Sequence, residues 1–193
     1  MEFDGDEIWY PIDSTPYAQG GNSYVYRAVN HSNNEVSALK LYIHRANERR
    51  QYDRFLQEIE IVKSISNLRG CVRLLDHGFY EEQPFYVMPF YKGGTFKSKY
   101  LNANDTSCYS EKLEKFQELL QIIRRLHYIG LAVRDIKPQN ILFDASENPI
   151  VADFGLSFWV EAAEEERMTR AEEKLGAQGY RPPEWDSYYP GLN

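Results

Sequence analysis

The sequence has few of the features that mark secreted, membrane or zinc-binding proteins. It contains two cysteines, Cys71 and Cys108, too far apart to form a closely spaced metal-binding pair, and we interpret them as reduced thiols. The first ten residues, MEFDGDEIWY, lack the basic and apolar regions of a secretion signal. No apolar run approaches the ~20 residues that a membrane span needs. We therefore expect a cytoplasmic location.

An excess of positive charge is also missing. The 22 Lys and Arg residues against 29 Asp and Glu residues give a net charge of −7, which argues against nucleic acid or an anionic membrane as a main partner. A local phosphate site is still possible. The composition is 42% hydrophobic and 15% aromatic, as in a soluble globular protein. A chain of 193 residues suffices for one ordinary domain or for two small lobes around a cleft.

The first half of the chain has the pattern of a β-rich lobe. The runs NSYVYRAVN and EVSALKLYI are typical of strands, and the polar segment HSNNE between them predicts a hairpin turn. A helix is predicted over 46–66, because apolar residues recur there at helical spacing: Phe55, Ile59, Val62 and Ile65. Two further strands are expected within CVRLLDHGFYEE and PFYVMPFY.

The second half has a mainly helical pattern. A long helix is predicted from Ser110, as N-cap, to a stop at Gly130. Its expected apolar face consists of Leu113, Phe116, Leu119, Leu120, Ile123 and Leu126. Short strands should follow at 141–143 and 150–152. We therefore expect an α+β protein with lobes at 1–91 and 92–193. The acidic run EAAEEERMTRAEEK predicts a mobile loop or an exposed helix.

Two patterns in the first lobe suit phosphate binding. Gly20 and Gly21 permit a tight turn that brings backbone N–H groups close to an anion, although an ordinary hairpin turn uses the same residues. Lys40 shares a strand face with apolar Ala38, so its ammonium needs a counter-charge. Glu58 on the following helix is the candidate. The alternative for a strand lysine is that it extends into solvent.

The second lobe contains polar residues within apolar runs. GLAVRDIKPQNILF places Arg134, Asp135, Lys137 and Asn140 among apolar neighbours, and VADFGLS brings Asp153 from a strand into a turn. The oxygens of Asn140 and Asp153 are hard ligands that suit Mg²⁺, and Asp135 could orient a hydroxyl nucleophile. Each of these residues alone is also common as a turn former.

Together and in this order, the glycine-rich turn, the strand lysine, the helix glutamate, RDIKPQN and DFG resemble the catalytic domain of eukaryotic-type Ser/Thr protein kinases, including bacterial members. The resemblance covers roughly residues 12 to 186. It implies a bilobal fold with an antiparallel β N-lobe, one main helix and an incomplete, mainly helical C-lobe. It also implies ATP-dependent phosphorylation of protein hydroxyls, with Mg²⁺ or Mn²⁺ as cofactor and without a nucleic-acid or membrane partner.

The resemblance assigns roles to individual residues. Asp135 would be the catalytic base, Lys137 would neutralise the transferred phosphoryl group, and Asn140 and Asp153 would hold the metal ions. Arg134 would pair with a phosphate on the chain's own loop, with Thr169 as the expected acceptor. Nucleotide binding would fall to Ala18, Gly20, Gly21, Val25, Ala38, Lys40, Glu58, Met88, Pro89, Tyr91 and Leu142. Among these, Lys40 would contact the α- and β-phosphates and pair with Glu58, in preference to Glu60.

Three departures from the family pattern keep alternatives open. Val133 replaces the usual His before Arg-Asp, so we expect a loosened catalytic loop with activity retained. Ala177 replaces a Thr that positions substrate. The chain ends nine residues after Glu184 of the PPE motif, where the family continues into further helices. We expect a truncated protein, a fragment, or a partner chain that covers the surface. The alternatives to a kinase are a nucleotide-binding pseudokinase that acts as an interaction module and, less favoured, a small-molecule phosphotransferase.

Overall fold

The computed structural model describes residues 1–43, 49–101, 108–160 and 180. Its chain divides into two compact units, Met1–Lys92 and Gly93–Asn193. The fold is α+β, as the sequence predicts. The expectations for the acidic run at 161–174, for Thr169 and Ala177 and for the PPE motif fall outside the described residues.

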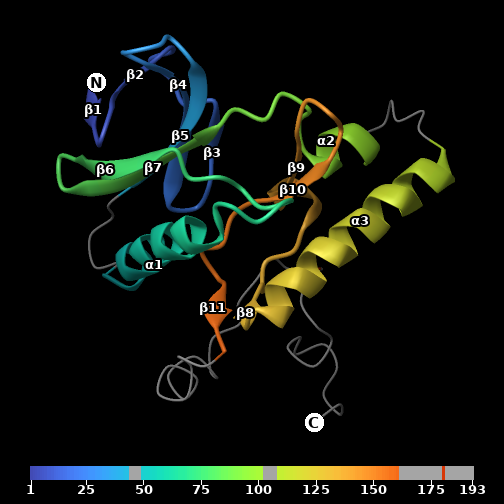
Figure 1. Ribbon diagram of the computed structural model, residues 1–193. Helices are drawn as coiled ribbons and strands as arrows, with labels where there is room; N and C mark the ends of the chain where they lie inside the picture. The colour runs from blue at the N-terminus through green and yellow to red at the C-terminus, as the bar shows by residue number, and fades with distance from the viewer. Residues whose placement is uncertain (44–48, 102–107, 161–179, 181–193) are drawn as a thin grey trace. The chain divides into compact units, whose positions relative to one another are not determined.

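The first unit is built on one antiparallel sheet with the strand order β1-β2-β4-β5-β7-β6, and β3 pairs with β4 (Figure 1). The strands are β1 (Phe3–Asp4), β2 (Ile8–Pro11), β3 (Ala18–Gln19), β4 (Ser23–Asn30), β5 (Val36–Tyr42), β6 (Asp76–Tyr80) and β7 (Gln83–Pro89). The predicted hairpin is confirmed, because β4 and β5 form an antiparallel ladder. Its first pair is Ser23 opposite Tyr42 and its last is Val29 opposite Val36. The edge strands β1 and β6 also contact each other, so the sheet curls around a core.

Alternation along the strands separates the two faces of this sheet. One face forms an apolar cluster of Phe3, Trp9, Tyr26, Ala28, Leu39, Leu41, Phe85 and Val87. The other carries Tyr42 and Tyr86, whose rings lie 5.7 and 5.8 Å from the ring of Phe55 on helix α1 (Arg49–Ile65). The described part of the helix predicted at 46–66 is thus confirmed. Its packing places the side chains of one helix stripe against the sheet.

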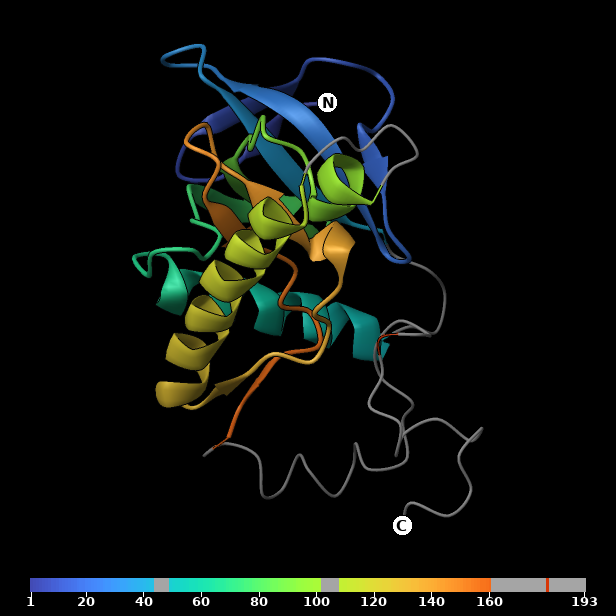
Figure 2. The ribbon, with the colours of Figure 1, turned by 90° about the vertical axis from the view of Figure 1, so that its right-hand side faces the viewer.

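The second unit joins two helices to two small ladders (Figure 2). The helices are α2 (Phe96–Tyr100) and α3 (Tyr109–Tyr128), and a 3-10 turn, η1, spans Pro138–Asn140. Strands β9 (Ile141–Phe143) and β10 (Pro149–Val151) form one antiparallel pair, and β8 (Leu131–Ala132) and β11 (Phe158–Trp159) form the other. The hairpin of β9 and β10 positions the residues immediately before and after it.

Helix α3 corrects two expectations. Cys108, and not Ser110, occupies the N-cap, and Ser110 lies inside the first turn. The predicted stop is confirmed, since Gly130 follows the last turn with a left-handed φ of 83°. Only part of the predicted apolar face is buried, namely Leu119, Ile123 and Leu126 together with Ile122, whereas Leu113, Phe116 and Leu120 are exposed. The apolar residues form two adjacent stripes, and only one packs against β8 and β10.

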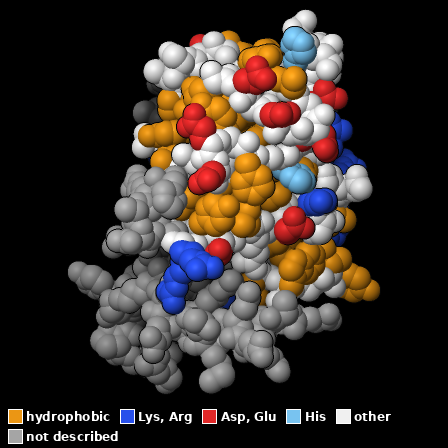
Figure 3. All heavy atoms as spheres, turned by 90° about the vertical axis from the view of Figure 1, so that its left-hand side faces the viewer, with side chains coloured by type: hydrophobic (Ala, Val, Ile, Leu, Met, Phe, Trp, Pro, Cys, Tyr) orange, Lys and Arg blue, Asp and Glu red, His pale blue; other side chains and the backbone are white. Residues whose placement is uncertain are grey.

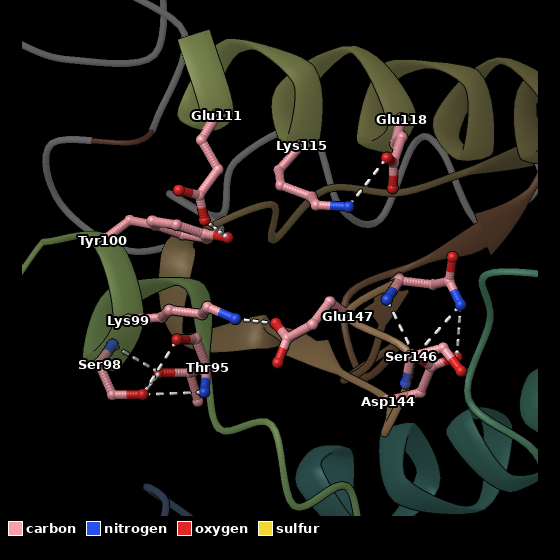
Figure 4. Close-up of polar contacts among 11 residues, drawn as sticks. Thr95, Ser98, Lys99, Tyr100, Glu111, Lys115, Glu118, Asp144, Ser146 and Glu147 are labelled. Carbon is pink, nitrogen blue, oxygen red and sulfur yellow. Dashed lines mark hydrogen bonds and ion pairs between the residues drawn. The ribbon is translucent and has the colours of Figure 1, made fainter. Parts of the chain in front are cut away.

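Polar side-chain contacts connect the elements of the second unit (Figure 4). Thr95 caps α2 through a reciprocal pair of hydrogen bonds with Ser98. The Tyr100 hydroxyl donates to Glu111 Oε1 over 3.0 Å, and Lys99 pairs with Glu147 in the turn between β9 and β10. These contacts join α2 to α3 and join α2 to the turn between β9 and β10.

One face of the described residues shows how the charged side chains are distributed. On the face shown in Figure 3, acidic side chains lie scattered among apolar and neutral ones. Among the described helices, none combines the length and the apolar character that crossing a bilayer requires.

Candidate active site

The first unit contains a buried ion pair at Lys40. Its Nζ lies 2.7 Å from Oε1 and 3.0 Å from Oε2 of Glu58, which α1 carries on its buried stripe. Lys40 is only 9% exposed and Glu58 only 2%. The expected pair is therefore present, and Glu60 is exposed on another side of the helix. Burial of two charges in one pair fixes the lysine in place, because either charge alone would be costly to bury.

A third residue of this pair was missed by reasoning from the sequence. The Tyr86 hydroxyl donates to Glu58 Oε1 over 2.9 Å. Tyr86 lies directly opposite Lys40 in the ladder of β5 and β7, and opposite residues share a face of the sheet. The strand register of PFYVMPFY would have revealed the contact, but the register cannot be known before the strands are paired.

The rings around Lys40 add to its environment. Its Nζ lies 5.6 Å from the Tyr86 ring centroid and 5.7 Å from that of Phe55, within the range of cation–π attraction. The ammonium therefore meets a carboxylate and two aromatic rings on one side of the sheet.

Four predicted nucleotide-binding residues share the face of the sheet that bears Lys40. Val25 pairs with Lys40 across β4 and β5, and Ala38 pairs with Met88 across β5 and β7. Since directly opposite residues and alternate residues of a strand point the same way, Val25, Ala38, Lys40 and Met88 line one surface. Pro89 ends β7, and Tyr91 follows two residues later in the same unit.

The glycine-rich segment forms a tight turn between β3 and β4. Ala18 pairs with Val25, and the Gly20 N–H donates to the Ser23 carbonyl over 2.8 Å. A Cβ added at Gly21 would meet no atom within 4 Å, so the backbone there is open to a ligand. The turn alone would also suit an ordinary hairpin, as the sequence already indicated.

The strand leading into this turn is interrupted, a feature that reasoning from the sequence missed. Both β2 and β3 pair with β4, but residues 13–17 form a bulge between them. The Ile12 N–H still donates to the Arg27 carbonyl over 2.8 Å, and pairing resumes with Ala18 opposite Val25. The bulge places the ring of Tyr17 edge-on to that of Phe90, with centroids 5.3 Å apart. Tyr17, next to the predicted nucleotide-binding residue Ala18, thus contacts Phe90, which lies between the predicted residues Pro89 and Tyr91.

The second unit brings three predicted catalytic residues together. Lys137 Nζ forms an ion pair with Asp135 Oδ2. Asn140 Nδ2 donates to the same oxygen over 3.0 Å and to the Asp135 carbonyl over 2.9 Å. Pro138 starts the 3-10 turn that returns the chain toward Asp135. Asp135 and Asn140 are both buried. Their polar groups form hydrogen bonds with each other within the loop, as buried polar groups require.

Asp153 lies next to this loop. The Ala152 N–H donates to the Asn140 carbonyl over 2.9 Å, which joins the two segments. Asp153 adopts a left-handed φ of 65°, a conformation that costs energy for a residue other than glycine and that concentrates at functional sites. The following Phe154 is fully buried and anchors the turn.

The oxygen donors of Asn140 and Asp153 fit Mg²⁺, which prefers hard ligands and keeps positions for phosphate and water. Within the described ranges, no group of three or more His, Cys, Asp or Glu side chains gathers as a preformed metal cage. With one carboxylate and one amide oxygen, the donor chemistry of Asp153 and Asn140 suits an ion that shares its coordination with a bound phosphate.

The remaining predicted residues of the second unit are placed as follows. The Arg134 guanidinium carbon lies 3.9 Å from the centroid of the Phe158 ring, so the arginine stacks on the first residue of β11. Val133 is half-buried. Leu142 lies on β9, where it bridges to Thr95.

Comparison with known families now identifies the class. A family model described as the protein kinase domain matches residues 17–189, and the chain belongs to this family. The resemblance to Ser/Thr kinases drawn from the sequence is thereby confirmed.

Two relatives illustrate the family's range. The chain is 32% identical over 168 residues to the serine/threonine-protein kinase PknL of Mycobacterium tuberculosis, covering 86% of this chain and 41% of the relative. It is 31% identical over 185 residues to wall-associated receptor kinase 5 of Arabidopsis thaliana, covering 93% of this chain and 24% of the relative. The chain spans 41% of the length of PknL and 20% of that of the probable serine/threonine-protein kinase PknB of Lactococcus lactis, so it covers less than half of these relatives.

Proposed function

We propose that this protein transfers the γ-phosphate of ATP to serine and threonine hydroxyls of protein substrates. The observation that carries the proposal is the Asp135–Lys137–Asn140 cluster, found in a chain that also buries the Lys40–Glu58 pair. Family membership and the names of the relatives support the same reaction. Neither half of the machinery needs covalent chemistry from the protein, since phosphoryl transfer depends on positioning and on charge.

The first unit would bind the nucleotide. Lys40 would contact the phosphates, and the surface made by Val25, Ala38 and Met88 is apolar enough to accept the flat base. The Pro89 carbonyl and the Tyr91 N–H would read the edge of the base. Proline suits the accepting position, because it has a carbonyl and lacks an N–H.

The second unit would carry the transfer. Asp135 would accept the proton of the substrate hydroxyl, and Lys137 beside it would offset charge on the transferred group. Asn140 and Asp153 would hold Mg²⁺, or Mn²⁺ in its place. When bound, this ion neutralises phosphate charge.

Location and partners belong to the same proposal. Cys71 and Cys108 form no disulfide, which suits the reducing cytoplasm, and the net charge of −7 disfavours nucleic acid and anionic membranes as partners. The exposed stripe of Leu113, Phe116 and Leu120 on α3 supports the idea that another protein chain covers the second unit.

The test is transfer of labelled γ-phosphate to casein by the wild type and by Asp135→Asn, with ATP affinity measured in parallel. We expect the substitution to lower the transfer rate by about 10²–10⁴-fold, the usual contribution of a general base, while ATP affinity changes by less than about twofold. Asp144→Asn is the matched control, since Asp144 accepts hydrogen bonds in a turn of the same unit. Nucleotide binding without transfer by the wild type would contradict the proposal and favour the pseudokinase.

A further inference from the structure

We propose that Tyr86 is a positioning residue, which holds Glu58 and thereby Lys40 in the arrangement that receives the nucleotide phosphates. The inference rests on the proposed function and adds a residue to it. Tyr86 does not itself contact the reacting groups in this scheme. It acts on Lys40 through a carboxylate and through the face of its own ring.

The three residues come from three elements of the first unit. Lys40 lies on β5, Glu58 on α1 and Tyr86 on β7. Tyr86 is 1% exposed, so its hydroxyl meets Glu58 Oε1 at 2.9 Å in a place that water reaches poorly. A hydrogen bond from a neutral donor to a buried carboxylate is stronger there than at the surface.

The two donors on Glu58 differ in how freely they move. Lys40 has a flexible four-carbon stem and must turn toward an anion in order to bind it. The Tyr86 ring is packed between its neighbours, and only its hydroxyl rotates. When Lys40 shifts part of its interaction to a phosphate, the tyrosine hydroxyl still holds Glu58 Oε1. Helix α1 therefore keeps its connection to the sheet during nucleotide binding.

Tyr86 also contacts the lysine directly. Lys40 Nζ lies 5.6 Å from the Tyr86 ring and 5.7 Å from the Phe55 ring, and the two rings lie 5.8 Å apart. Lys40 therefore contacts two aromatic rings as well as the Glu58 carboxylate. Tyr86 thus contacts both members of the ion pair, Glu58 through its hydroxyl and Lys40 through its ring. The two contacts can be separated, because Tyr86→Phe keeps the ring and removes only the hydroxyl.

The chain supplies a matched control at Tyr100. This residue is also 1% exposed, and its hydroxyl donates to a glutamate, Glu111 Oε1, over 3.0 Å. Tyr100 lies in the other unit and has no assigned role in the reaction. Tyr86→Phe and Tyr100→Phe therefore remove the same kind of hydrogen bond, and a purely structural role predicts similar consequences for both.

The experiment is a double-mutant cycle on nucleotide affinity. The dissociation constant of a non-hydrolysable ATP analogue with Mg²⁺ is measured for wild type, Tyr86→Phe, Glu58→Gln and the double variant. Loss of one hydrogen bond should weaken binding by about fivefold in Tyr86→Phe. The same change in the Glu58→Gln background should weaken it by less than about 1.5-fold, since coupled residues are not additive. Tyr100→Phe should leave the affinity within about 1.5-fold.

Hydrogen exchange of the unliganded protein gives a second measurement that needs no binding. Tyr86→Phe should raise the exchange of amides within 49–65 and leave those within 109–128 unchanged. An equal loss of affinity in both backgrounds, an equal loss in Tyr100→Phe, or unchanged exchange in α1 would overturn the inference. A wild type that binds the analogue but transfers no phosphate would overturn only the proposed activity. A wild type that binds no nucleotide would overturn both.

Discussion

The buried charged residues of the two units meet their partners over very different distances along the chain. In the first unit, Glu58 meets partners 18 and 28 positions away. Asp76 accepts hydrogen bonds from Asp6, Glu7 and Trp9, 67 to 70 positions away. In the second unit, the partners of Asp135 lie two and five positions away, and Asp144 bonds residues within four positions.

This difference has a physical consequence. A contact between distant residues forms only after the sheet and the helix have assembled, so the first unit's polar network and its fold should fail together. A contact inside one loop requires only that loop. Substitutions in the first unit should therefore reduce stability and binding at once, whereas substitutions in the second should reduce turnover with little loss of stability.

The largest expected effect is that of Lys40→Met. It leaves Glu58 buried at 2% exposure without its ammonium partner, and breaking a buried pair in this way costs about 3–5 kcal/mol of unfolding free energy. The rate of phosphate transfer should also fall by roughly 10²–10³-fold, because a preorganised contact with the phosphates is lost. Urea denaturation and the transfer assay measure the two effects.

The double variant Lys40→Met with Glu58→Leu separates these effects. Replacing both charges by apolar side chains should restore most of the stability, but it cannot restore transfer. If Lys40→Met unfolded at the same urea concentration as the wild type, the coupling of stability to binding in the first unit would be refuted.

The next effect is at Asp76, which is buried and accepts four hydrogen bonds, from the Asp6, Glu7 and His77 N–H groups and from Trp9 Nε1. Asp76→Ala leaves these donors without their acceptor and should lower the unfolding free energy by about 3 kcal/mol. Asp144→Ala in the second unit removes a partly buried, local acceptor and should cost less than about 1 kcal/mol. Chemical denaturation of both variants measures the two losses of unfolding free energy.

Gly5 offers an independent view of the same contact. A Cβ at this position would lie 2.6 Å from both carboxylate oxygens of Asp76, so Gly5→Ala should also destabilise the protein. Equal stability losses in Asp76→Ala and Asp144→Ala would remove the contrast between long-range and local networks.

A smaller effect, confined to turnover, is expected for Asn140→Ala. The substitution removes both hydrogen bonds to Asp135 and one proposed metal ligand, so kcat should fall by about 10²-fold. The melting temperature should change little, since the contacts lie within one loop. Asn148→Ala is the control, because Asn148 Nδ2 likewise donates to a nearby carboxylate, that of Asp144, over 2.9 Å. A fall in melting temperature as large as that of Lys40→Met would contradict the prediction.

The same contrast explains what could be predicted from the sequence. The hairpin of β4 and β5, the described part of α1 and the end of α3 depend on local turn residues and periodicity, and they were predicted correctly. The Asp135–Lys137–Asn140 contacts follow from a short motif. Tyr86, by contrast, lies opposite Lys40 through the pairing of β5 with β7 and meets Glu58 through the packing of α1 on the sheet. No local pattern reveals either contact.

Three further predictions were missed or wrong. Periodicity predicted one apolar face on α3, but not how much of it another element would cover, and Leu113, Phe116 and Leu120 of that face are exposed. The bulge at 13–17 cannot be predicted without the register of its partner strand. The start of α3 was placed two residues too late, because cysteine is not among the residues that commonly mark an N-cap and Ser110 is.

A modest effect is expected at Cys108, another local contact of the second unit. Its pKa is lowered, first by the hydrogen bond with the Ser110 hydroxyl, at 2.9 Å, and then by the Glu111 N–H. A lower pKa means more thiolate near neutral pH, so Ser110→Ala should slow alkylation by iodoacetamide at pH 7.5 by about two- to threefold. Rates are measured across pH in a Cys71→Ser background. An unchanged pH profile would show that Ser110 does not act on the thiol.

The smallest effect should come from Val133→His. The hydrogen bonds that hold the second unit's loop run between Asp135, Lys137 and Asn140, and none of these bonds involves position 133. Restoring the family's histidine at this half-buried position should therefore change the transfer rate by less than about threefold. The transfer assay and the melting temperature test this together. A rise of several orders of magnitude would show that the loop needs support from outside its own short motif. The Asp135 cluster would then not be a local site, and the contrast with the long-range network of the first unit would be refuted.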